Sequence, residues 1–116
     1  MTRTYQQLTR DISTNLGPLR KSVPQVMAGF SEMGRAAMAD GAIGEKTKEL
    51  IALAIGVATR CDGCIGFHSK ALARLGASVE EVHETLGVAV YMGGGPSAMY
   101  AANAVAAFNE FSAVTA

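Results

Sequence analysis

The chain has only two cysteines, Cys61 and Cys64, and His68 follows four residues after the second. On a helix that begins at Cys61, positions i, i+3 and i+7 lie on one face. The first turn of a helix carries unpaired N–H groups and the positive end of the helix dipole, and both favour a thiolate. The pattern therefore indicates a dithiol with one activated sulfur, and His68 is placed to accept or return a proton.

Glu49, twelve residues before Cys61, is a second candidate for proton transfer. It lies near the start of a segment, about 45–59, that begins polar and then turns apolar on nearly every side, as in a buried helix. If this helix folds back on the cysteine helix, Glu49 can exchange protons with His68. Periodicity alone does not favour Glu49 over Glu45.

The rest of the sequence predicts an all-α fold of about six helices. No run alternates apolar and polar residues over the length of a strand. A Gly-Pro pair at 17–18 is expected to close the first helix, and Ser78 with Glu81 forms a capping-box pattern before the fifth. The last helix is rich in alanine, which allows a neighbour to approach closely. The expected helices cover about 4–15, 24–39, 45–59, 61–75, 78–92 and 96–113.

Length and composition limit the class of protein. With 116 residues the chain is expected to be a single domain, 1–116. Hydrophobic residues make up 49% and charged residues 17%, and this apolar surplus in a small chain suggests burial between subunits. The net charge of zero and the absence of a basic stripe argue against nucleic acid as a partner. The longest apolar run, 50–58, is too short to span a membrane, so a cytoplasmic protein is expected.

The spacing Glu49-x11-Cys61-x2-Cys64-x3-His68 resembles the core motif of the alkylhydroperoxidase D / carboxymuconolactone decarboxylase superfamily. The flanking segments "KTKELIALAIGVATRCDGC", "GFHSKALARLGASVEEVHE" and "GGGP" are similar as well, and the resemblance covers about 38–108. It implies an alkylhydroperoxidase D-like helical bundle that forms a homo-oligomer, usually a trimer or hexamer. It also implies a thiol-dependent peroxidase or disulfide oxidoreductase that needs no cofactor.

Carried over by position, the resemblance makes Cys64 the thiol that attacks peroxide and Cys61 the resolving thiol. Glu49 and His68 would form the proton relay, and a lipoyl or thioredoxin-like protein or a small thiol would be the reductant. Since the first cysteine is the more reactive in generic Cys-x-x-Cys proteins, the division between the two stays open. The best-known peroxidase of the family has a histidine where this chain has Gly63, which puts one arm of the relay and strong peroxidase activity in question.

Three other readings of the cysteines remain. Cys61, Cys64 and His68 offer three zinc ligands, but a closed structural site needs a fourth, from His83 or Glu49. The pair can also form a disulfide in a non-catalytic redox sensor or interaction module, or it can be an inert part of the core. Decarboxylase activity is disfavoured because that branch lacks the cysteine pair. His83, which lies among glutamates, is expected on the surface.

Overall fold

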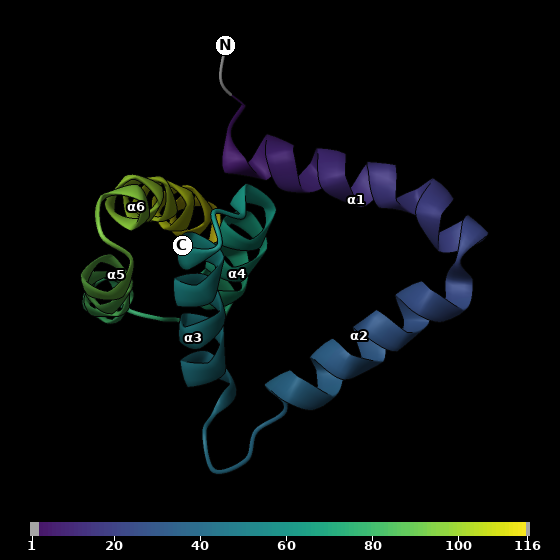
Figure 1. Ribbon diagram of the computed structural model, residues 1–116, viewed down its shortest axis with the longest axis horizontal. Coiled ribbons are helices and arrows are strands. Elements are labelled where there is room, and N and C mark those ends of the chain that lie inside the picture. The colour runs from purple at the N-terminus through teal and green to yellow at the C-terminus, as the bar shows by residue number, and fades with distance from the viewer. Residues whose placement is uncertain (1–2, 116) are drawn as a thin grey trace.

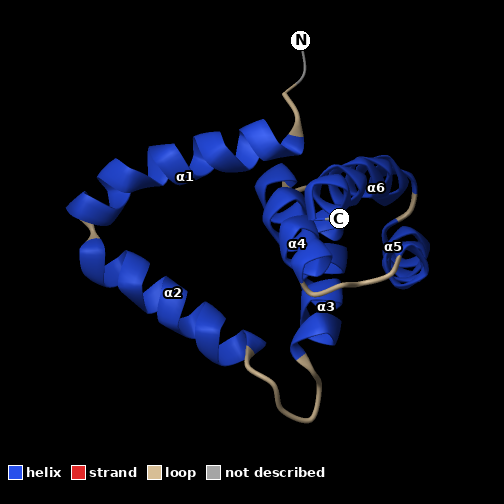
Figure 2. Ribbon diagram, turned by 180° about the vertical axis from the view of Figure 1, so that it is seen from behind, coloured by secondary structure: helices blue, strands red, loops and turns tan. Residues whose placement is uncertain are grey.

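The computed structural model describes residues 3–115 as six helices joined by short loops, with no strand among these residues (Figures 1 and 2). The helices are α1 (Tyr5–Ser22), α2 (Pro24–Met38), α3 (Glu45–Ala58), α4 (Asp62–Arg74), α5 (Val79–Gly93) and α6 (Gly95–Thr115). The predicted all-α fold is confirmed. None of the described helices combines the length and the apolar character needed to cross a membrane.

The second to sixth helices begin and end within about two residues of the predicted positions, because their caps are local signals. Pro24 occupies the first turn of α2, and Ser78 and Glu81 form the predicted capping box. The predicted end of the first helix at Gly17–Pro18 is wrong: α1 continues to Ser22 with Pro18 inside it. Proline removes one helical hydrogen bond, to the carbonyl of Thr14, and that residue is exposed, so water can satisfy it.

The core lies between the last four helices, which pack around one another (Figure 1). The alanine-rich α6 contributes Ala101, Ala104 and Ala107 at a spacing of three, and all three are buried. Small side chains on this face let α6 approach α4, as the sequence predicted. The buried apolar side chains of the other three helices are Leu53, Val57, Ile65, Leu72, Ala73, Val82, Leu86 and Ala89.

Helices α1 and α2 form an arm that diverges from this core, and only the start of α1 is seated on it (Figures 1 and 2). The carboxylate of Glu110 in α6 accepts hydrogen bonds from the backbone N–H groups of Tyr5 (2.9 Å) and Gln6 (3.2 Å), which are free at a helix start. Gly66 in α4 leaves room for Thr9, the one buried residue of α1. The arm is therefore anchored to α4 and α6 at one end.

Gly66→Ala tests this anchor. A Cβ at residue 66 would lie 2.6 Å from Cγ2 of Thr9, so α1 has to shift. We expect the variant to lose about 1–3 kcal/mol of unfolding free energy and its α1 to become more sensitive to protease. Urea denaturation and limited proteolysis measure both. Gly87→Ala is the control: nothing lies within 4 Å of its added Cβ, so this helical position should gain roughly 0.5–1 kcal/mol. Equal stability of both variants would contradict the proposed packing.

Candidate active site

The turn between α3 and α4 brings the two cysteines to the start of α4. The backbone N–H of Arg60 donates to the carbonyl of Val57 (3.1 Å), and that of Cys61 donates to the carbonyl of Gly56 (2.9 Å). This pair of bonds is a Schellman motif, which requires a left-handed residue between them. Arg60 takes that position with φ 58°, where glycine is usual. The chain therefore ends α3 and starts α4 within three residues.

Gly56 allows α3 and α4 to approach each other beside the cysteines. A Cβ at residue 56 would lie 3.0 Å from Cβ of Cys64, which is tighter than ordinary packing. Gly56 is itself buried, in the last turn of α3. A larger residue there would push the second cysteine away from α3, and with it the helix that carries His68.

Cys61 and Cys64 are joined by a disulfide, with their Cα atoms 5.2 Å apart. Cys61 is the N-cap of α4, and its Sγ accepts a hydrogen bond from the backbone N–H of Cys64 (3.1 Å). The same bond and the dipole of α4 would stabilise a negative charge on the Cys61 sulfur in the reduced protein. The described chain is thus in the oxidised state of the predicted dithiol.

Glu49 and His68 form the contact that links α3 to α4 next to the disulfide. Nδ1 of His68 lies 2.6 Å from Oε1 of Glu49, and the Glu49 side chain is 9% exposed whereas that of His68 is 32% exposed. A carboxylate at Nδ1 favours the tautomer in which Nδ1–H donates to it, and Nε2 is then free to accept a proton. The structure brings together the two residues predicted for proton transfer: Glu49 contacts His68, whereas Glu45 lies near Arg74 (3.6 Å).

Gly63, where the family's best-known peroxidase has a histidine, lies beneath α1. A Cβ at residue 63 would lie 3.0 Å from Cδ1 of Ile12. A larger residue at this position would require the end of the Ile12 side chain to move by a few tenths of an ångström. Glu49 and His68 remain as the predicted relay.

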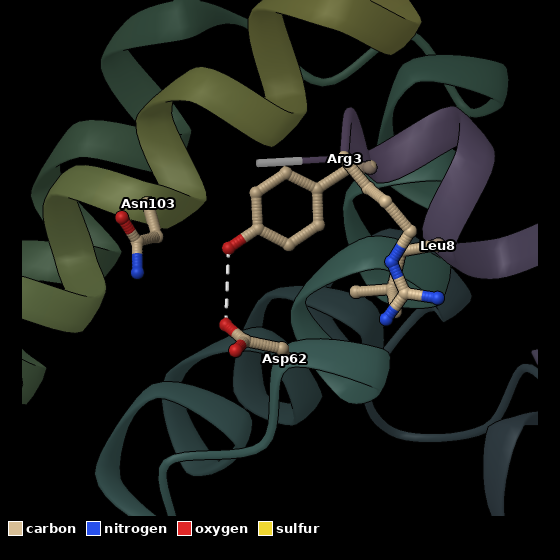
Figure 3. A pocket seen from close by; sticks show the side chains of 5 residues that line it. Arg3, Leu8, Asp62 and Asn103 are labelled. Atoms are coloured by element: carbon tan, nitrogen blue, oxygen red, sulfur yellow. Dashed lines mark hydrogen bonds between the residues drawn. The ribbon is translucent and has the colours of Figure 1, made fainter. Parts of the chain in front are cut away.

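A polar pocket of about 370 Å³ opens at the start of α4, between α1 and α6 (Figure 3). Its lining residues are Arg3, Tyr5, Leu8, Asp62 and Asn103. The Tyr5 hydroxyl donates to Oδ1 of Asp62 (3.1 Å), the residue that follows Cys61. Partial burial and the adjacent Asp62 carboxylate raise the pKa of Tyr5 well above its usual range. The tyrosine thus ties α1 to the turn that holds the cysteines.

Metal ligation has little support in this geometry. Among the described residues, no group of three or more His, Cys, Asp or Glu side chains is arranged to hold a metal ion. The cysteine sulfurs bond to each other and His68 contacts Glu49. His83, the proposed fourth zinc ligand, is exposed on α5, as expected for a surface residue.

Three contributors to the site were missed at the level of sequence: Tyr5, Gly56 and Arg60. Tyr5 and Asp62 are 57 residues apart, and no local spacing connects them. The end of α3 at Arg60 is not evident from the sequence, because glycine is the residue that normally takes the left-handed position after a helix. In the sequence, Gly56 looks like a residue that weakens an apolar helix. A glycine inside a helix can, however, mark a place where a second helix approaches closely.

Tyr5→Phe should weaken the seat of α1 and change how stability depends on pH. The lost hydrogen bond should cost roughly 1 kcal/mol or less at pH 7. Because folding raises the pKa of Tyr5, its contribution is constant below pH about 10 and is lost as the pH rises further. Urea denaturation between pH 7 and 11 should therefore show a steeper alkaline decline for the wild type than for the variant. Parallel curves would contradict this role.

Comparison with known proteins connects most of the chain to one family. The family model for the carboxymuconolactone decarboxylase family matches residues 24–107. An uncharacterized protein of Cupriavidus necator is 37% identical over 113 residues, which cover 97% of this chain and 100% of that protein. An uncharacterized protein encoded in the cox locus of Paracoccus denitrificans is 34% identical over 98 residues, which cover 84% of this chain and 88% of that protein.

A solved structure agrees with the fold described above. The crystal structure of an apo carboxymuconolactone decarboxylase family protein from Legionella pneumophila superposes with a TM-score of 0.91 at 58% identity. The match covers 93% of this chain and 96% of that one. Sequence and fold agree, and the chain belongs to the carboxymuconolactone decarboxylase family.

Proposed function

We propose that this protein is a thiol oxidoreductase that reduces hydroperoxides or disulfides by cycling Cys61 and Cys64 between dithiol and disulfide. The observation that carries the proposal is the disulfide at the start of α4, one helical turn from a His68 whose Nδ1 contacts the buried Glu49. A carboxylate–imidazole pair next to a dithiol is the arrangement that moves protons during thiol chemistry.

The proposed peroxidase cycle has three steps: oxidation of one thiolate, formation of the disulfide, and its reduction. One thiolate attacks the terminal oxygen of ROOH; the O–O bond breaks, a sulfenic acid forms and ROH leaves with a proton. The second thiol displaces water from the sulfenic acid and forms the Cys61–Cys64 disulfide. A dithiol reductant then exchanges with this disulfide, returns two electrons and two protons, and becomes a disulfide itself. A disulfide substrate would enter by the same exchange.

Glu49 and His68 are proposed to carry the protons of this cycle. His68 takes the proton of the attacking thiol and delivers it to the leaving alkoxide, while the Glu49 carboxylate stabilises the imidazolium formed in between. The hydrogen bond from the Cys64 N–H favours negative charge on Cys61, whereas the family resemblance assigns the attack to Cys64. The single-cysteine variants described below decide between them.

Intact-mass spectrometry of the reduced protein, titrated with cumene hydroperoxide, tests the cycle. We expect one equivalent to remove two hydrogens from the wild type. Of Cys61→Ser and Cys64→Ser, the variant that keeps the attacking cysteine should stop at a sulfenic acid. Addition of dihydrolipoamide, a dithiol, should restore the reduced wild type and support many turnovers.

Each alternative function gives a different result in this titration. A redox sensor would oxidise once without turning over with any dithiol, and a zinc domain would release free thiols only after the metal is removed. Lactone decarboxylation would survive the loss of both cysteines. Thiols that stay reduced at excess hydroperoxide would end the peroxidase proposal.

Glu49→Gln tests the relay, because it keeps the shape of the side chain and removes its charge. We expect thiol oxidation by hydroperoxide to slow about 100-fold or more in this variant. The double variant with His68→Ala should be scarcely slower than either single one, since the two residues act as a unit. Stopped-flow kinetics measure these rates. Glu45→Gln, one turn earlier on α3, is the matched control and should keep the wild-type rate; multiplicative losses in the double variant would refute the relay.

Other expectations from the sequence remain predictions. They are a single domain over residues 1–116, a cytoplasmic location, a lipoyl or thioredoxin-like reductant, and assembly as a trimer or hexamer.

A further inference from the structure

A polar groove follows one flank of α1, where this helix crosses the core. Two adjoining pockets of about 260 and 290 Å³ form the groove, and both are lined by Thr9 and Arg10 of α1 and by Lys70 of α4. The α1 side also includes Gln6, Ser13 and Thr14. Positions 6, 9, 10, 13 and 14 share one face of a helix, and all five residues are polar. We call the two pockets together the α1–α4 groove.

The charged side chains of the α1–α4 groove are both positive. They are Arg10, which comes from the arm, and Lys70, which comes from the core, and both are exposed. Within residues 3–115, neither of them takes part in an ion pair or a hydrogen bond. The hydroxyls of Ser13 and Thr14 likewise form no hydrogen bond with the described part of the chain. The groove therefore offers two cations and two hydroxyl donors to a ligand.

The helices that line the groove supply no negative charge to these cations. Each of α1, α4 and α6 contains a single acidic residue, and each of the three is engaged elsewhere. Asp11 pairs with Arg3 (2.9 Å). Asp62 accepts a hydrogen bond from the hydroxyl of Tyr5, and Glu110 accepts from the backbone at the start of α1. Two like charges thus line one groove with no counter-charge from its own walls, which favours an anion there.

Each pocket of the groove also has an apolar wall. Phe67 of α4 provides it in one pocket, and Phe111 and Val114 of α6 provide it in the other. Phe67 is half-buried, so part of its ring is open to a ligand, whereas Phe111 is only 4% exposed. Pockets of this size lie at the lower end of the range for small-molecule sites. The ligand that fits is therefore a small organic anion, with an apolar group next to its charge.

We propose that the α1–α4 groove binds a small phosphate monoester, with its phosphate at Arg10 and Lys70 and its apolar group against Phe67. Such a phosphate carries close to two negative charges at pH 7, which matches the two cations, whereas a carboxylate carries one. Its three terminal oxygens can also accept hydrogen bonds from Ser13 and Thr14. Because the walls belong to both arm and core, the ligand would hold α1 on α4. The site is independent of the thiol chemistry proposed above.

Isothermal titration calorimetry of the full-length protein with phenyl phosphate at pH 7 tests the site. We expect one saturable site per chain with a Kd of roughly 1 mM or tighter, and roughly tenfold weaker binding of benzoate and of inorganic phosphate. Arg10→Gln and Lys70→Gln should each weaken phenyl phosphate roughly tenfold. Arg20→Gln and Lys21→Gln, at the far end of α1, are the matched controls and should keep the wild-type affinity. All four positions are exposed, so circular dichroism should show an intact helical fold.

Several outcomes of the titration would overturn the proposal. Benzoate or inorganic phosphate that binds as tightly as phenyl phosphate would exclude a phosphate monoester as the ligand class. Equal losses in all four variants would show a general attraction for anions, which a chain of zero net charge is not expected to have. A wild type without saturable binding, or an Arg10→Gln or Lys70→Gln variant with unchanged affinity, would exclude the site.

Hydrogen exchange gives a second readout, because a ligand between arm and core should restrain α1. Saturating phenyl phosphate should slow amide exchange over residues 9–16 in the wild type and have no such effect at the same concentration in Lys70→Gln. Exchange in this segment that is unchanged by phenyl phosphate in the wild type would show that the ligand does not bridge α1 and α4.

Discussion

The site depends on how closely α3 approaches α4 at Gly56. That approach places the buried Glu49 against His68, and a side chain at residue 56 would push against Cys64 and widen it. The left-handed Arg60 serves the same end, since it reverses the chain fast enough for Cys61 to cap α4. A slower turn would separate the carboxylate from the imidazole. A conformation that costs a non-glycine residue about 1–2 kcal/mol is therefore retained beside the chemistry.

Helix α1 is tied to the same few residues. It passes over Gly63, enters the space left by Gly66 and holds Asp62 through the hydroxyl of Tyr5. The first turn of α4 thus carries the cysteines on one side and anchors the N-terminal arm on the other. A larger residue before Cys64 would require the Ile12 side chain to move. A proton relay built on Glu49 and His68, without the extra histidine of the best-known peroxidase, is consistent with that packing.

The arm and the core also differ in how their apolar residues are used. In the core, the apolar faces of α3 to α6 are buried against one another, with alanines on α6 setting the spacing. In the arm, the large side chains of α2 remain exposed. Composition alone indicated this surplus of apolar residues. The structure shows where part of this surplus lies: on the exposed face of α2 and in a groove between α3 and α5.

By itself, the sequence determined the all-α class, the bounds of five helices and the cysteine pair with His68 one turn on. These are local properties, which depend on helix-capping residues, hydrophobic periodicity and i, i+4 spacing. It misplaced the end of α1, because a Gly-Pro pair such as 17–18 usually ends a helix. Here the helix continues, since water can bind the one carbonyl that loses its hydrogen bond to Pro18. Glu49 was singled out over Glu45 only through a family resemblance. Only the tertiary structure shows that Glu49 contacts His68, that Gly56 lies against Cys64, and that Glu110, 105 residues away, binds the backbone of Tyr5. Such contacts depend on how helices pack, and packing is a property of distant residues that no local pattern records.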